Sequence, residues 1–327
     1  MEDNNFNFDS RVDLSALRHA MEDVRREVGK VLVGQNKMVD QLLVALLTRG
    51  HVLIEGVPGV AKTISAKILA RCLEMDFSRI QFTPDLMPSD IIGTSIFDVG
   101  KASFSFKKGP IFSNFVLIDE INRAPAKTQA ALFEVMEERQ ITADGTRYPM
   151  EEPFIVIATQ NPIEQEGTYR LPEAQLDRFL FKIKVGYPTA KQEVEIILRE
   201  HNSTENQKID VVNPVLKSSD LLIYQALVKQ VAVKQELIQY IADIVCKTRE
   251  HHLLYLGASP RASLAMLTAS KGFAALEGRD FATPDDIKLA AGSVLNHRIV
   301  VSPEREMEGL TAENVIEQII ESIPVPR

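Results

Sequence analysis

The chain has no tryptophan, only two cysteines and no long apolar run among its 327 residues. Cys72 and Cys246 are too far apart in sequence for a cysteine-based metal or redox motif, which favours a reducing compartment. The longest apolar stretches, such as residues 42–47, fall far short of the roughly 20 residues that span a bilayer. The net charge of -8 argues against a protein dedicated to binding nucleic acid.

The remaining composition is that of a globular protein large enough for two domains. Hydrophobic residues make up 45% and charged residues 25% of the chain. The first ten residues are polar and acidic, without the basic and apolar regions of a signal peptide. We therefore expect a cytoplasmic protein.

Three continuous apolar runs in the first half predict strands that are covered on both faces. These are HVLIE at 51–55, FVLID at 115–119 and FIVIA at 154–158. The segments between them are long enough for crossover helices, as at residues 63–73. An α/β domain with a parallel sheet between helix layers is expected.

Two segments interrupt this pattern and predict β-hairpins. Residues 96–106 alternate around a Gly-Lys turn, and residues 139–150 contain Asp144-Gly145, a strong hairpin turn signal. Beyond Pro188, helical periodicity replaces the strand-like runs, and residues 202–210 read as a polar loop. We predict an α/β domain over 1–187 and a smaller all-helical domain over 188–327.

Residues 55–67, EGVPGVAKTISAK, nearly match the phosphate-binding loop, with Ala61 where the pattern has its second glycine. The loop follows an apolar run and precedes a helical one, so backbone N–H groups and the helix start would converge on an anion. A residue entering a helix normally has negative φ, and we expect this of Ala61. Lys62 would contact the outer phosphates and Thr63 would ligate Mg²⁺. The alternative is an ordinary Gly/Pro turn before a helix.

Polar residues end two of the predicted strands. Asp119 could hold Mg²⁺ and Glu120 could take a proton from the attacking water, or both could be solvated strand-end carboxylates. Asn161 could orient that water, although spacing alone favours an ordinary turn residue.

Two arginines stand out by context. Arg178 precedes an apolar run, a position usual for a surface arginine. Arg261 lies in a predicted first helical turn, where the helix dipole disfavours a cation. A nearby anion such as a nucleotide phosphate would offset that cost; the alternative is a flexible, exposed side chain.

In order and spacing, these motifs resemble those of the MoxR family of AAA+ ATPases over most of the chain. The likeness rests on VGQ (33–35), EGVPGVAKT, FTPDLMPSDIIGT (82–94), KGPIF, LIDEINRAPAKTQAALFEVMEE, ATQNP, LPEAQLDRF and SPRAS. The alanine before Lys62 looks like the form usual in this family.

The resemblance implies a P-loop NTPase fold, a three-layer sandwich with a helical lid, that binds ATP or ADP with Mg²⁺. It implies that Asn161 is the sensor-1 residue, Arg178 the arginine finger given to the neighbouring subunit, and Arg261 the sensor-2 arginine of the lid. The implied nucleotide-binding residues are Val33, Gly34, Gln35, Gly56, Val57, Pro58, Gly59, Val60, Ala61, Lys62 and Thr63.

The resemblance also implies a hexameric ring with chaperone-like work on client complexes, alongside partners that carry a von Willebrand factor A domain. The two hairpins match inserts of this clade that would face the ring pore or a client. An alternative is a nucleic-acid motor like the replicative MCM helicases, which resemble the clade in these inserts; Lys101, Lys107 and Lys108 favour it. The acidic balance argues against it. A nucleotide switch without hydrolysis is disfavoured by Asp119 and Glu120.

Overall fold

A computed structural model describes residues 12–100, 102–162, 168–169, 171–202 and 210–326. Lys101, the first eleven residues and most of the loop predicted at 202–210 lie outside these ranges. Throughout the described part, every helix is too short or too polar to cross a bilayer.

A five-stranded parallel sheet forms the centre of the first domain. Its strand order is β2-β5-β8-β1-β9. All three apolar runs predicted as strands lie in it. The strands are β1 (Val52–Gly56), β2 (Phe77–Gln81), β5 (Phe115–Asp119), β8 (Ile155–Gln160) and β9 (Phe181–Val185).

Successive residues of each inner strand contribute to different cores on the two faces of the sheet. In β5, Phe115 and Leu117 belong to one buried cluster, whereas Val116 and Ile118 belong to the other. Both faces are therefore apolar, which is why these strands read as unbroken apolar runs.

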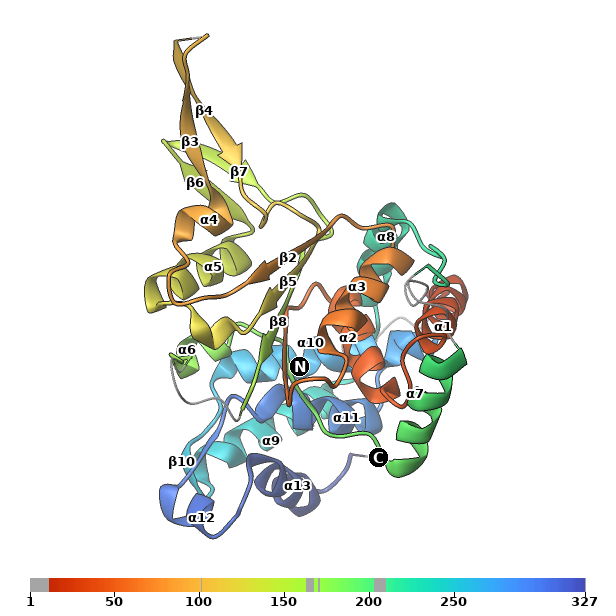
Figure 1. The fold of residues 1–327 in the computed structure, drawn as a ribbon. Coiled ribbons are helices and arrows are strands. Elements are labelled where there is room, and N and C mark those ends of the chain that lie inside the picture. The colour runs from red at the N-terminus through yellow and green to blue at the C-terminus, as the bar shows by residue number, and fades with distance from the viewer. Residues whose placement is uncertain (1–11, 101, 163–167, 170, 203–209, 327) are drawn as a thin grey trace, which may run out of the picture.

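Helices cover both faces, as predicted for the three-layer sandwich (Figure 1). The first cluster includes buried residues of α1 (Ser15–Gly29), α2 (Asn36–Leu47) and α3 (Lys62–Cys72). The second includes residues of α4 (Pro88–Ile92), α5 (Ala126–Glu138) and the 3-10 turn η1 (Ile121–Arg123).

Both predicted hairpins are present and project together from the same end of the molecule (Figure 1). β3 (Gly93–Asp98) pairs with β4 (Ser103–Lys108), and β6 (Gln140–Ala143) with β7 (Thr146–Pro149). Phe106 of β4 stacks on Tyr148 of β7 with ring centroids 4.6 Å apart, so the two hairpins support each other.

The remainder of the chain is helical, as predicted, apart from one short antiparallel ladder, β10 (Leu254–Leu256) with β11 (Val300–Val301). Thr189 caps α7 by accepting a bond from the Gln192 N–H at 3.4 Å. The short helix α6 (Glu173–Leu176) precedes β9. The later helices are α7 (Ala190–Asn202), α8 (Ser218–Lys229), α9 (Gln235–Glu250), α10 (Pro260–Leu276), α11 (Pro284–Leu295), α12 (Pro303–Met307) and α13 (Ala312–Ser322).

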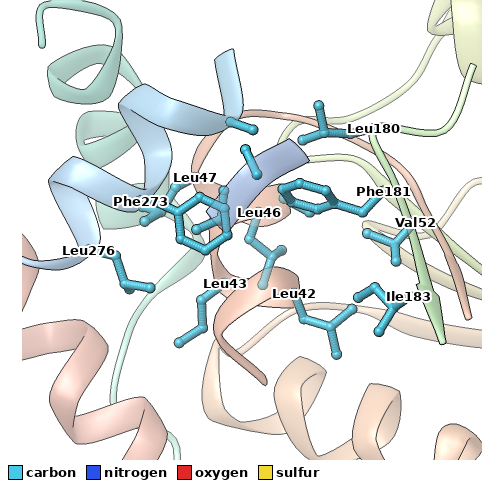
Figure 2. Close-up of a cluster of buried hydrophobic side chains, with 14 of the residues drawn as sticks. Leu42, Leu43, Leu46, Leu47, Val52, Leu180, Phe181, Ile183, Phe273 and Leu276 are labelled. Carbon is cyan, nitrogen blue, oxygen red and sulfur yellow. The ribbon is translucent and has the colours of Figure 1, made fainter. Parts of the chain in front are cut away.

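The helical part packs onto the sheet through α2. Figure 2 shows leucines of this helix lying between side chains of β9 and of α10. Phe181 of β9 and Phe273 of α10 also approach to 6.1 Å between ring centroids. The two parts therefore share one continuous core, and the dividing point at residues 187 and 188 stays a prediction.

Candidate functional site

The loop between β1 and α3 has the backbone of an anion site. Among the described residues, no acceptor takes a hydrogen bond from the backbone N–H groups of Gly59, Val60 or Ala61. The first intrahelical bond of α3 runs from the Ser65 N–H to the Ala61 carbonyl at 3.0 Å, so the Thr63 and Ile64 N–H groups in the first turn have no intrahelical acceptor. Gly59 has φ +87°, which turns the chain back toward the helix start. This donor set fits a phosphate group.

The negative φ expected for Ala61 is wrong. Ala61 has φ +63° and ψ 19°, the left-handed conformation, and it precedes the helix as its N-cap instead of lying inside it. This position explains why the general pattern has glycine here. Alanine has the smallest side chain that can occupy this conformation, at a cost of about 1 kcal/mol.

Lys62 bridges the ends of two strands beside the loop. Its ammonium donates to the carbonyl of Gly56, at the end of β1, and to that of Gln160, at the end of β8, the latter at 3.3 Å. Asn161 follows Gln160 directly and is buried. The carboxyl ends of adjacent parallel strands thus bring Lys62 and Asn161 to one edge of the sheet.

Asp119 and Thr63 lie together at this same edge. The Thr63 hydroxyl is 3.3 Å from Asp119 Oδ1, and the Thr159 hydroxyl donates to the same oxygen at 3.1 Å. Hydroxyl and carboxylate oxygens suit Mg²⁺, which in such sites takes one or two carboxylates plus substrate phosphates. Thr63 and Asp119 would hold the ion, which would neutralise phosphate charge when bound. The described residues contain no cluster of three His, Cys, Asp or Glu ligands.

An arginine that the sequence did not single out neutralises Asp119. Arg79 Nε, on β2, donates to Asp119 Oδ2 at 2.6 Å. The Asp119 carboxylate is almost fully buried, whereas about half of the Arg79 side chain is exposed. The mobile partner of this ion pair is therefore the arginine.

Glu120 points away from Asp119 and has its own partners. Its φ of 58° ends the strand, and its N–H donates to the Thr159 hydroxyl at 3.1 Å. Its Oε2 accepts from Gln81 Nε2 at 2.9 Å and pairs with Arg123 Nε at 3.0 Å. Both partners bind Oε2, so the other carboxylate oxygen can take a proton from water without an exchange of these partners.

Residues 33–35 form a turn that lies against the start of α7. Gly34 has φ +73°, and a Cβ there would meet the Gln192 side chain at 2.2 Å. Gln35 lines a cavity of about 240 Å³ whose apolar wall includes Leu32 and Val39. The lining of that cavity does not include residues of the loop 56–63.

Arg178 and Arg261 meet at one carboxylate, Glu137, in the last turn of α5. Arg178 Nη1 pairs with Glu137 Oε2 and donates to the Phe133 carbonyl at 3.0 Å. Arg261 Nη2 lies 3.1 Å from Glu137 Oε1. The first turn of α10 was predicted to need an anion near Arg261, and Glu137 is that anion here.

A buried arginine fixes the segment that carries Arg178 to the helical domain. Arg298 donates to Asp177 Oδ1 at 2.7 Å and to the carbonyls of Phe179 and Leu180, among others. The Ser259 hydroxyl, at the start of α10, donates to Asp177 Oδ2 at 3.0 Å. A movement of α10 should therefore move the segment that carries Arg178 as well.

These arginines lie at the end of the sheet opposite the loop. The Leu180 N–H donates to the His51 carbonyl just before β1, and His51 Nε2 donates to Met136 O in the last turn of α5. Along β1 and β9, Val52 pairs with Phe181 and Gly56 with Val185. A strand of this length separates the two ends by about 13 Å.

Apart from residues 33–35, the predicted residues form two groups. Loop 56–63, Asp119, Glu120 and Asn161 gather at the carboxyl ends of the strands, whereas Arg178 and Arg261 gather at the amino ends. Sequence reasoning missed the partners of both groups, which are Arg79, Gln81, Arg123, Glu137 and Arg298. The one local signal for Arg298 was its place in a polar run, Asn296-His297-Arg298, that follows an apolar helix.

Comparisons with known proteins match both parts of the chain to known domain families. Residues 51–181 match the ATPase family associated with various cellular activities (AAA), and residues 246–319 match the AAA lid domain. The chain is 45% identical to Chaperone MoxR1 of Mycobacterium tuberculosis, with 96% of this chain and 84% of the relative aligned. It is also 45% identical to YeaC of Bacillus subtilis, over 91% and 92% of the two chains.

A solved structure of a protein from Cytophaga hutchinsonii described as an ATPase superposes with a TM-score of 0.88. It is 44% identical, with 96% of this chain and 97% of that one aligned. Identity at this level over nearly the whole length, together with both domain matches, establishes the family. The chain belongs to the MoxR family of AAA+ ATPases.

Proposed function

We propose that this ATPase hydrolyses Mg-ATP between neighbouring copies in a hexameric ring, and that hydrolysis drives chaperone-like remodelling or maturation of protein complexes in the cytoplasm. The observation that carries the proposal is the separation of the two groups of site residues. The phosphate loop and the arginines lie at opposite ends of one parallel sheet, about 13 Å of strand apart. Arg178 therefore does not reach the loop of its own chain, but it would reach one presented by a neighbour.

Each residue then has a distinct role. Lys62 would bind the outer phosphates, Thr63 and Asp119 would hold Mg²⁺, and Glu120 would activate the water that Asn161 orients. Arg178 and Arg261 would contact the neighbour's terminal phosphate from its open side. An arginine supplied in this way can be worth orders of magnitude in rate, so turnover becomes conditional on docking.

The pocket for the adenine is proposed at residues 33–35. The cavity at Gln35 offers the apolar wall that a purine ring needs. The lining of this cavity does not include loop 56–63. A nucleotide that extends from the cavity to the loop would therefore have to move the start of α7, which lies against Gly34.

The hairpins support work on a protein partner. The exposed fractions of Val99 and Phe104 are 85% and 72%, at the far end of a projecting structure. Exposed apolar groups of this kind mark interaction sites. The relative named Chaperone MoxR1 supports the same class of work, with a client complex and a von Willebrand factor A-domain protein as the partners we propose.

The MCM-like motor remains the second candidate on one observation, the lysines Lys107 and Lys108 on β4. The net charge of -8 opposes it. Binding of a polynucleotide that weakens steeply with salt would favour the motor, whereas no binding at low salt would remove it.

Subunit mixing tests the main proposal. Lys62→Ala should abolish nucleotide binding, Glu120→Gln should keep binding and block turnover, and Arg178→Ala should keep binding and lose the turnover that rises with protein concentration. A mixture of the Lys62→Ala and Arg178→Ala chains should regain activity, because one supplies the arginines and the other the loop. Full turnover by Glu120→Gln would show that the base is wrong, and unchanged turnover by assembled Arg178→Ala would reject the role in trans.

A further inference from the structure

Two arginines from different domains share a single carboxylate at the amino-end edge of the sheet. Glu137 uses Oε2 for Arg178 and Oε1 for Arg261, the latter at 3.1 Å. We call these three residues the arginine edge. The exposed fractions of their side chains are 39% for Glu137, 28% for Arg178 and 56% for Arg261, so an incoming anion can reach them.

The charges of the arginine edge do not balance. Two guanidinium groups face one carboxylate, which leaves a net charge of about one positive unit. Arg178 also has an unmet donor, because its buried Nε finds no acceptor in the described part of the chain. The arginine edge can therefore bind more negative charge than Glu137 supplies.

We propose that Glu137 competes with the terminal phosphate of the neighbouring subunit's nucleotide for Arg178 and Arg261, and so holds both arginines back until a triphosphate arrives. The inference rests on the proposed function, since it takes the arginines to act in trans. Glu137 is a positioning residue: it touches neither nucleotide nor water and acts through the two guanidinium groups.

The competition favours ATP over ADP for a simple reason. A terminal phosphate carries more charge than a carboxylate and offers several acceptor oxygens to two guanidinium groups, so it displaces Glu137. ADP ends one phosphate earlier and leaves the arginines on Glu137. Docking of subunits then depends on the triphosphate state.

Arg178 and Arg261 must be released together for this exchange. They share the carboxylate, and Asp177 binds both Ser259 at the start of α10 and the buried Arg298. These bonds tie the chain segment that carries Arg178 to the start of α10, which carries Arg261. Removing the charge of Glu137 should therefore weaken the hold on both, and leaves Arg178 its bond to the Phe133 carbonyl.

Glu137→Gln is the decisive substitution, because it removes the charge and keeps the shape. Two partly exposed ion pairs weaken at once, so the protein concentration for half-maximal turnover should fall roughly three- to ten-fold. Glu138→Gln, one residue along the same exposed turn and without an ion pair in the described residues, is the matched control.

Mixing two variant chains shows whether the effect of Glu137→Gln arises in the chain that supplies the arginines. Glu137→Gln is combined with Lys62→Ala, in the chain that supplies the intact arginines, and titrated against the Arg178→Ala chain. The half-maximal concentration should fall, and the shift should follow the chain that carries both arginines. Sedimentation of the same mixtures should show more association with ADP than the parent mixture shows, a readout independent of turnover.

Three results would overturn the inference. A higher half-maximal concentration would mean that Glu137 orients the arginines for docking instead of withholding them. An unchanged curve, with equal urea midpoints for variant and parent, would leave Glu137 without a role. If the Lys62→Ala and Arg178→Ala chains fail to complement each other at all, the action in trans is wrong and the proposed function fails with it. If they complement each other but Glu137→Gln does not shift the half-maximal concentration, only the present inference is rejected.

Discussion

Acid should destabilise this protein through His51, a buried histidine that the fold keeps neutral. His51 Nδ1 accepts a hydrogen bond from the Val156 N–H at 2.9 Å, and Nε2 donates to Met136 O at 3.2 Å. Only the neutral ring can do both, because the protonated ring has no acceptor. Burial, and then the charge of Arg139, lowers the pKa of His51 from 6.5 to about 3.

The size of the effect follows from proton linkage. The unfolded chain takes up a proton on His51 below pH 6.5, whereas the folded chain does so only below about pH 3. The stability that this neutral ring contributes is complete above pH 6.5 and is lost as the pH falls through this window, at about 1.4 kcal/mol per pH unit. Between pH 6.5 and pH 5 the loss is about 2 kcal/mol for this residue.

A second histidine acts in the same direction. His297 donates through Nε2 to the Phe179 carbonyl at 3.0 Å, and burial lowers its pKa well below 6.5. The loss between pH 6.5 and pH 5 for the whole protein should therefore exceed the about 2 kcal/mol that His51 alone contributes.

Urea unfolding at a series of pH values measures this slope. His51→Asn keeps an acceptor for the Val156 N–H and cannot titrate, so its loss between pH 6.5 and pH 5 should be smaller by about 2 kcal/mol. Its stability at pH 7 should drop as well, since Met136 O loses its donor, so the slopes are compared and not the absolute values. His19→Asn, on the exposed side of α1, is the control for replacing a histidine as such. If His51→Asn kept the parent slope, the fold would not be holding His51 neutral.

Two further substitutions test the partners of the site residues. Arg79→Gln should lower the Mg²⁺ concentration needed for half-maximal binding of a fluorescent ATP analogue by several-fold, because the guanidinium no longer neutralises Asp119; a higher requirement would mean that Arg79 contacts the nucleotide. Arg298→Met should cost about 3–5 kcal/mol in urea unfolding, since Asp177 keeps a charge without its buried partner. A loss below about 1 kcal/mol would contradict the conclusion that Arg298 holds the segment carrying Arg178 to the helical domain.

The sequence predicted the parts of the fold that depend on local pattern. The inner strands are buried on both faces, so their composition alone separates them from helices and loops. The hairpin at Asp144-Gly145 followed from a turn in which both residues have positive φ, 50° and 76°. The loop 56–63 followed from its position between a strand and a helix.

The errors and omissions arose where local reasoning stops. Ala61 was expected to have the negative φ of a residue entering a helix, but it is the N-cap and its φ is positive. Glu137 was not singled out, because its partner Arg261 is 124 positions away in the sequence. Arg298 was missed for the same reason, since Asp177 is 121 positions away. Which charges meet across such distances depends on how the sheet and the helical domain pack, and periodicity carries no information about that.

Every charged candidate for binding or catalysis outside the loop meets an opposite charge of its own chain in the isolated subunit. Binding of metal, nucleotide or neighbour is then an exchange of partners, and its free energy is a difference between two ion-pair sets of similar kind. Such differences are small, so a change of one phosphate can reverse them. The docking and release of subunits that we propose would require this property. The pairs are Asp119 with Arg79, Glu120 with Arg123, and Glu137 with Arg178 and Arg261.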